Sequence, residues 1–157
     1  MPASNQTVQG EGFSLVELLI AITVIGALIA IALPQFNLYK DQQKVSLAVA
    51  DLRVLDNQLK SFKLSNDGFP AALSDLPQVA PSDPWGAPYQ YLNIEAADTK
   101  GKGNLRKDKN LVPINSDFDL YSKGPDGNSV APLTAKASRD DIIRANDGGY
   151  FGVAEKY

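Results

Sequence analysis

Gly12-Phe13-Ser14-Leu15-Val16-Glu17 leads directly into an apolar run that ends at Leu33. A helix from Phe13 to Leu33 would be roughly 31 Å long at about 1.5 Å per residue, which matches the hydrocarbon thickness of a bilayer. Glu17 is the only charged residue in this span. An ionised carboxylate there costs about 2.5–3.5 kcal/mol on insertion scales, so it requires a partner. No Lys, Arg or His lies nearby in the sequence, and the partner is therefore expected on another copy of the chain.

Composition excludes several functional classes. The 157 residues include no Cys and no His, and the formal net charge is −3. Without Cys, no disulfide can support an extracytoplasmic fold and no thiol chemistry is available. The mildly acidic balance offers no basic field for nucleic acid, so no nucleic-acid partner is expected. The absence of His and of a nucleophile or phosphate-binding motif argues against an enzyme.

A second helical segment follows Pro34. Its apolar residues recur at steps of three and four and form one stripe at helical spacing; they are Val45, Ala48, Leu52, Leu55, Leu59 and Phe62. The stripe predicts packing on the protein's own sheet, with a coiled coil as the alternative. Asn66-Asp67-Gly68 tolerate left-handed backbone and should end the helix. Because Pro34 lacks an amide hydrogen, a kink or local melting is expected between Gly26 and Pro34.

The remainder of the chain predicts a small antiparallel sheet. Residues 71–76 are interpreted as a short helix or turn, and the patterns at 89–93, 117–121 and 150–154 as strands. The segment 95–112 is interpreted as a solvated loop, with contact to an acidic neighbour as the alternative. Its cations are Lys100, Lys102, Arg106, Lys107 and Lys109. The predicted fold class is α+β, with a long N-terminal helix, its first half transmembrane, packed on the sheet.

The N-terminal pattern resembles the type IV pilin and type II secretion pseudopilin family. The resemblance rests on Gly12-Phe13, on Glu17 four residues later, on Gly26 in mid-helix and on Pro34 at the end of the run. It implies that a prepilin peptidase cuts between Gly12 and Phe13 and methylates the new Phe13 amine. It also assigns filament assembly to Phe13, Glu17, Gly26 and Pro34, because the apolar segment stays on the mature protein.

The same resemblance divides the chain into three segments. These are a leader peptide at 1–12, a transmembrane and assembly helix at 13–34, and a periplasmic domain at 35–157. The leader departs from the family's pattern because it contains no Lys or Arg. An ordinary secretory signal is the alternative, since Ala30-Ile31-Ala32 offers a cleavage site. In that case the product would be a secreted soluble calcium-binding module.

Two later segments are similar to the globular domain of the major (G-type) pseudopilin of type II secretion. Residues 83–91 (DPWGAPYQY) match the family's D-P-W-G-x-P-Y-x-Y segment. Residues 117–127 (DFDLYSKGPDG) match its D-x-D-L-x-S-x-G-x-D-G segment. With the N-terminal pattern, the resemblance covers most of the chain.

In that family the loop after the D-G turn binds calcium. The resemblance therefore implies Ca²⁺ held by the carboxylates of Asp126, Asp140 and Asp141 and by the carbonyl of Lys123, an all-oxygen set of the kind calcium takes. From the residues alone, Asp126 can belong to a plain turn and Asp140-Asp141 can start a helix. The segment 128–139 is longer and more basic than the family's loop.

The function implied by the resemblance is that of a structural subunit of a periplasmic pseudopilus that drives protein export, with a type IV pilus subunit as the alternative. The expected partners are copies of the same chain, other pseudopilins, the inner-membrane assembly platform and the prepilin peptidase. Before assembly, the apolar segment would lie in the bilayer of a bacterial inner membrane. The C-terminal domain would then lie in the periplasm.

Overall fold

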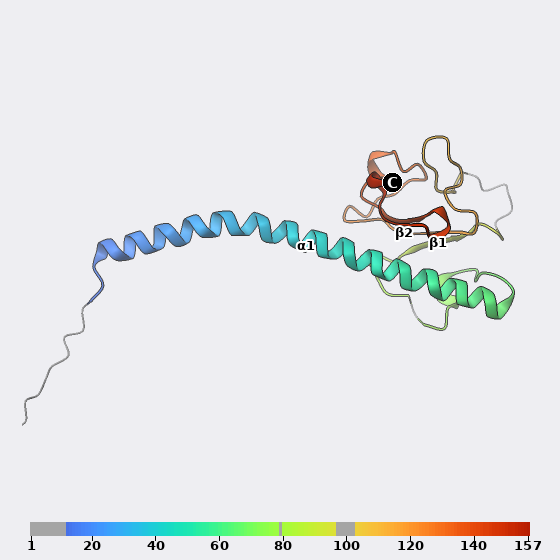
Figure 1. The fold of residues 1–157 in the computed structure, drawn as a ribbon, viewed down its shortest axis with the longest axis horizontal. Helices are drawn as coiled ribbons and strands as arrows, with labels where there is room; N and C mark the ends of the chain where they lie inside the picture. Colours follow the sequence, from blue (N-terminus) through green and yellow to red (C-terminus); the bar gives the residue numbers. More distant parts are fainter. Residues whose placement is uncertain (1–11, 79, 97–102) are drawn as a thin grey trace, which may run out of the picture. The chain divides into compact units, whose positions relative to one another are not determined.

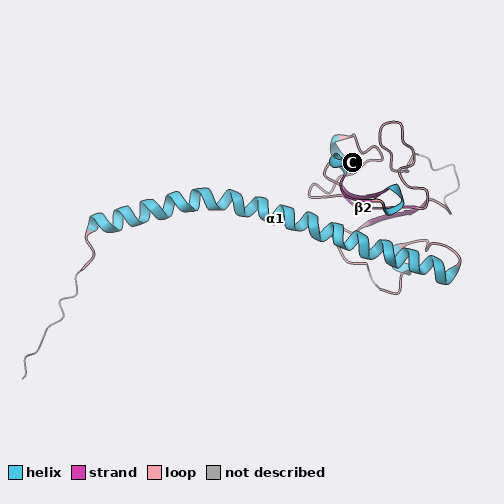
Figure 2. Cartoon of the chain, viewed as in Figure 1, coloured by secondary structure: helices cyan, strands magenta, loops and turns pink. Residues whose placement is uncertain are grey.

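The computed structural model describes residues 12–78, 80–96 and 103–157 (Figure 1). By its contacts the chain divides into two compact units, Met1–Lys40 and Asp41–Tyr157. Figure 2 shows one long helix and a small sheet. The elements in chain order are α1 (Leu15–Asn66), the 3-10 helix η1 (Leu73–Asp75), β1 (Gln90–Asn93), β2 (Phe118–Ser122), η3 (Lys136–Ser138), β3 (Ile142–Ala145), η4 (Asn146–Gly148), β4 (Tyr150–Val153) and η5 (Ala154–Lys156).

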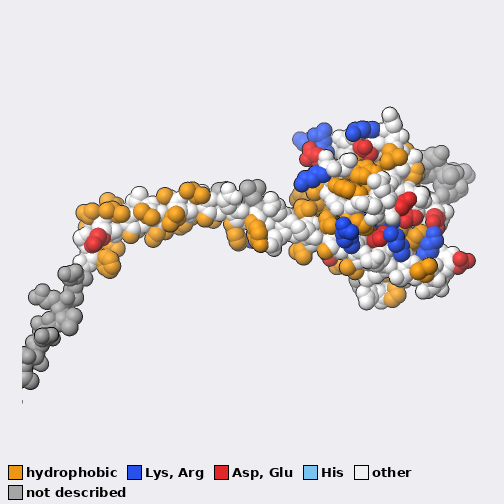
Figure 3. Space-filling view, in the orientation of Figure 1, with side chains coloured by type: hydrophobic (Ala, Val, Ile, Leu, Met, Phe, Trp, Pro, Cys, Tyr) orange, Lys and Arg blue, Asp and Glu red, His pale blue; other side chains and the backbone are white. Residues whose placement is uncertain are grey.

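The first unit contains the N-terminal part of α1. The stretch Leu15–Leu33 is long and apolar enough to cross a membrane, and none of it is buried within the chain. Hydrophobic side chains cover this segment in the space-filling view (Figure 3). The backbone stays helical through residues 26–34, so the local melting expected there is not present in the single chain. One missing donor at Pro34 removes one backbone hydrogen bond, and the turns on either side keep theirs. Of the predicted leader, residues 1–11 lie outside the described residues.

The second unit begins with the remainder of α1, and the predicted stripe faces its core. Ala48, Leu52, Leu55 and Leu59 are almost completely buried, and Val45 and Phe62 pack beside them. The helix ends where predicted, because Asp67 adopts a left-handed backbone with φ of 57°. The alternative of a coiled coil is not needed, since the stripe is already covered by the sheet of the same chain.

The sheet is antiparallel with strand order β1-β2-β3-β4. The strands predicted near 89–93, 117–121 and 150–154 are confirmed as β1, β2 and β4. The strand β3 was not predicted, because all four of its residues are buried and the usual alternation is lost. Asp140-Asp141 therefore precedes a strand, and the interpretation of this pair as a helix start is wrong.

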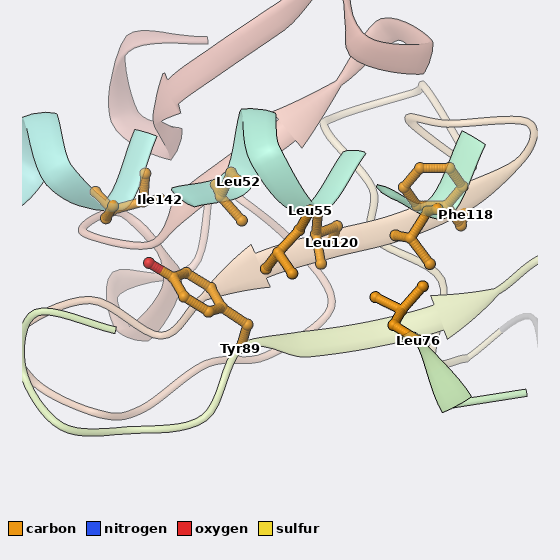
Figure 4. Close-up of a cluster of buried hydrophobic side chains, with 9 residues drawn as sticks. Leu52, Leu55, Leu76, Tyr89, Phe118, Leu120 and Ile142 are labelled. Carbon is orange, nitrogen blue, oxygen red and sulfur yellow. The ribbon is translucent and has the colours of Figure 1, made fainter. Parts of the chain in front are cut away.

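Two hydrophobic clusters lie on the sheet. Figure 4 shows the larger one, in which Leu52 and Leu55 of α1 meet Phe118 and Leu120 of β2, with Ile142 of β3 at its edge. The second cluster contains Ile114, Leu133, Ile143, Ala145 and Ala154. Since successive strand residues point to opposite faces, β3 contributes Ile142 to one cluster and Ile143 to the other. This double burial makes β3 the central element of the domain.

The interpretation of residues 95–112 as a solvated loop is wrong at Arg106. Lys100 and Lys102 lie outside the described residues, and Lys109 is exposed as expected. Arg106, in contrast, is only 2 % exposed. Its guanidinium group is buried because it forms an ion pair with the buried carboxylate of Asp141.

Candidate functional site

The N-terminus of α1 is closed by a reciprocal pair of hydrogen bonds. The Glu17 amide donates to the hydroxyl of Ser14 at 3.2 Å, and the Ser14 amide donates to the Glu17 carboxylate at 2.8 Å. This is a capping box, in which two otherwise unpaired backbone donors of the first turn are satisfied. Gly12 and Phe13 precede it and are exposed. The carboxylate of Glu17 is thereby fixed beside the end of the helix where Phe13 lies.

The sequence analysis identified Glu17 but missed Ser14, although the S-x-x-E signature was present in Ser14-Leu15-Val16-Glu17. The partner expected for Glu17 is a positive charge, and these hydrogen bonds do not supply one. No ion pair of Glu17 forms among residues 12–78, 80–96 and 103–157. The counter-charge must come from a group outside these contacts.

Gly26 and Pro34 both lie within α1. A Cβ atom added at Gly26 would meet nothing within 4 Å. The single chain therefore has no steric need for glycine at this position. Among the described residues the helix surface here is not buried, and its apolar side chains are available to lipid or to other helices.

Two of the predicted calcium ligands lie close together. The Asp126 amide donates to the Asp140 carboxylate at 3.3 Å, and Asp126 also accepts a hydrogen bond from the Asn128 amide at 2.7 Å. Gly124 has φ of +66°, and an added Cβ would lie 2.3 Å from the Asp140 carbonyl oxygen. Because only glycine permits that approach, the backbone after Lys123 is held against Asp140.

Asp141 does not join this pair. It is fully buried, and its Oδ2 atom accepts hydrogen bonds from Arg106 Nη2 at 2.5 Å and from the Ser129 hydroxyl at 2.6 Å. Burial raises the pKa of Asp141 to about 6, against the opposing effects of the Ser129 hydrogen bond and the Arg106 charge. In the part of the chain that the structure describes, no group of three or more His, Cys, Asp or Glu side chains could hold a metal ion. The ligand set expected from the resemblance does not fit, since Asp141 is engaged by a protein cation.

A second buried guanidinium connects α1 to the sheet. Arg144 of β3 donates to Asp56 of α1 at 2.5 Å and forms a two-point contact with Asp117 at 2.7 and 2.6 Å. It also lies 3.9 Å from the ring centre of Phe118. Burial opposes ionisation of Asp117, but the hydrogen bonds and charge of Arg144 outweigh it and lower the pKa of Asp117. Sequence reasoning missed this cluster, whose only signal was an arginine inside an apolar strand.

The two globular motifs contact each other. In the Trp85 segment, one Asp83 oxygen accepts hydrogen bonds from the amides of Trp85 and Ala87 at 3.1 and 2.8 Å. The other accepts a hydrogen bond from the Ser122 hydroxyl at 2.5 Å. Ser122 in turn accepts the Gly124 amide at 3.0 Å. These residues form a structural brace between the Trp85 turn and the end of β2.

The sequence is similar to proteins of type II secretion systems and to a type IV fimbrial protein. The chain is 32 % identical over 140 residues to the type II secretion system core protein G of Pseudomonas aeruginosa, covering 76 % of this chain and 86 % of that protein. The core protein G of Pectobacterium carotovorum is 28 % identical over 138 residues, covering 74 % and 77 %. The type IV major fimbrial protein FimA of Dichelobacter nodosus is 33 % identical over 129 residues, covering 78 % and 74 %. No protein-family model and no solved structure matches the chain.

Proposed function

We propose that this chain, which belongs to the family of type II secretion system core protein G, is the repeating subunit of a periplasmic pseudopilus that drives protein export. The proteins of this family are the major pseudopilins, and they are related to type IV pilins. Members of this family are structural proteins, so the chain is not an enzyme. The observation that carries the proposal is the apolar helix Leu15–Leu33, none of which is buried within its own chain.

Such a helix is stable in two environments. In a bilayer its backbone donors and acceptors are satisfied within the helix and its side chains contact lipid. In a fibre the same side chains would contact the helices of neighbouring copies. We therefore place the chain first in the inner membrane as a single span, with the domain after Pro34 in the periplasm, and then in a homopolymer. Other pseudopilins and the assembly platform are its proposed further partners.

Processing by a prepilin peptidase can be read from intact mass. We expect the mature chain to begin at Phe13 and to carry one added methyl group. A Gly12→Val variant should keep its leader, because the enlarged side chain stands at the cut. A mature chain that begins at Leu33 would instead show cleavage after Ala32. That result would contradict the function as a fibre subunit and support a secreted soluble module.

A type IV pilus subunit is the second candidate function, favoured by the 33 % identity to the fimbrial protein FimA. Deletion of the gene separates the two. Loss of protein export with surface pili intact supports the pseudopilus. Loss of surface pili with export intact supports the pilus.

We expect residues 26–34 to lose helical structure when copies assemble. Pro34 cannot donate a hydrogen bond to the Ala30 carbonyl, and Gly26 lowers helix stability by about 1 kcal/mol relative to Ala. This segment is thus the weakest part of the span, although it is helical in the single chain. Cryo-electron microscopy of fibres should show non-helical density there, and Pro34→Ala should restore helix and change fibre flexibility. Continuous helical density from residue 15 to residue 60 in wild-type fibres contradicts this expectation.

A further inference from the structure

We infer that the guanidinium group of Arg106, in place of a bound calcium ion, supplies the positive charge that holds the loop 123–141 closed. This inference goes beyond the proposed function, and its failure would leave the subunit role untouched. It concerns the segment 123–141, for which the family resemblance implies a metal. Arg106 contacts three separate parts of the domain, namely β2, the middle of the loop and Asp141.

Arg106 is anchored at its backbone before its side chain reaches the loop. Its amide donates to the Asp119 carboxylate of β2 at 2.9 Å, and its carbonyl accepts the Ile114 amide at 3.1 Å. The guanidinium carbon lies 4.2 Å from the ring centre of Tyr121, also on β2. The backbone of Arg106 and one side of its guanidinium group are therefore held against β2.

The loop contacts that charge through its middle and its C-terminal end. Nη1 of Arg106 donates to the Ser129 hydroxyl at 2.6 Å and to the Val130 carbonyl at 2.7 Å, and Nη2 donates to Asp141 at 2.5 Å. Ser138 adds a reciprocal pair of hydrogen bonds with the amide and carbonyl of Val130, at 2.9 and 2.8 Å. One cation thus gathers oxygens from the middle and the end of the loop, as a metal ion bound there would do.

The unpaired atoms of this cluster do not require an additional ion. Within the described residues, Asp141 Oδ1 and Arg106 Nε are both buried without a hydrogen-bond partner. They belong to the two members of the same ion pair, whose other atoms are already in contact. A hydrogen bond from Nε to Oδ1 would complete the side-on, two-point pairing that arginine forms with carboxylates. A calcium ion at Oδ1 would instead lie next to a like charge.

The longer and more basic segment 128–139 has a role in this arrangement. It supplies Ser129, Val130 and Ser138, which are the uncharged partners of the cluster. Segment 128–139 thus supplies the uncharged groups that surround the pair of Arg106 and Asp141.

The test uses the purified full chain in detergent micelles, with unfolding followed by the fluorescence of Trp85, the single tryptophan, which packs on the larger core cluster. The melting temperature of the wild type should be the same in excess EGTA and in excess calcium chloride. A calcium-dependent rise of several degrees, as expected for a ligand that binds only the folded state, would overturn the inference and support the Asp126 and Asp140 pair as a calcium site.

Three variants test the charge itself. Arg106→Met should lower the melting temperature by roughly 10 °C or more, because Asp141 is left buried without a counter-charge. Lys109→Met, which removes an exposed cation three residues away, should leave it unchanged. Arg106→Met combined with Asp141→Asn should regain part of the loss, since the buried negative charge is gone. An unchanged melting temperature in Arg106→Met, or no recovery in the double variant, would reject the role of the charge.

Discussion

Fibres should be lost or sharply reduced in cells that express Glu17→Ala, while membrane insertion and leader cleavage continue. In the proposed assembly, the apolar helix would move from lipid into a bundle of helices, where the Glu17 carboxylate would meet the Phe13 amine that the proposed cleavage creates on a neighbouring copy. At about 4 Å and an effective dielectric constant near 20, that attraction is roughly 4 kcal/mol before desolvation. The amine exists only after cleavage, which agrees with the absence of an ion pair at Glu17 among the described residues.

The capping box makes the choice of variants important. Glu17→Ala removes both the charge and the hydrogen bond to the Ser14 amide. Glu17→Gln keeps an acceptor for that amide and removes only the charge, and it should also abolish fibres. Ser14→Ala removes the hydroxyl cap and keeps the charge of Glu17, so the Ser14→Ala variant should still form fibres. Fibre yield in sheared fractions of overexpressing cells, normalised to the cleaved protein, provides the measurement. Normal yield from Glu17→Gln would contradict the charge pairing.

The second large effect is expected at Arg144. Replacement by Met leaves Asp56 and Asp117 near one another without their shared cation, since Arg144 contacts both of them. Removing one member of a buried ion pair costs about 3–5 kcal/mol, against a total stability of roughly 5–15 kcal/mol for a typical domain. We expect the melting temperature of the full chain in micelles to fall by more than about 10 °C.

A matched control is available close by. Arg139 is exposed, and within the described residues its side chain makes only one long hydrogen bond, of 3.4 Å, to the Thr134 carbonyl. Arg139→Met should therefore change the free energy of unfolding by less than about 1 kcal/mol. Arg144→Lys keeps the charge but loses the two-point contact with Asp117. Its melting temperature should therefore lie between those of Arg144→Met and Arg139→Met. A melting temperature for Arg144→Met equal to that of Arg139→Met would show that the cluster does not stabilise the domain.

The sequence was sufficient for the parts of the fold that depend on local patterns. The stripe that includes Leu52, Leu55 and Leu59 predicted which face of α1 is buried, because every residue on it is apolar and evenly spaced. The end of α1 was predicted because Asp67 and Gly68 carry a backbone preference of their own.

Features that depend on partners far away in the sequence could not be predicted from local patterns. Arg106 and Arg144 are charged, and charge alone predicts exposure. Their burial follows from Asp141 in one case and from Asp56 and Asp117 in the other, all of them far away in the sequence. The strand β3 was missed for a related reason, since both of its faces are covered and its pattern does not alternate.

The contact between Arg144 and Asp56 has a mechanical consequence. It joins two residues 88 positions apart and lies between α1 and β3. In the sheet order β3 stands between β2 and β4, so hydrogen-bonded ladders hold it on both sides. A push or pull delivered along this part of α1 is passed at that point to an interior strand. The load is then shared by the two ladders that join β3 to β2 and β4.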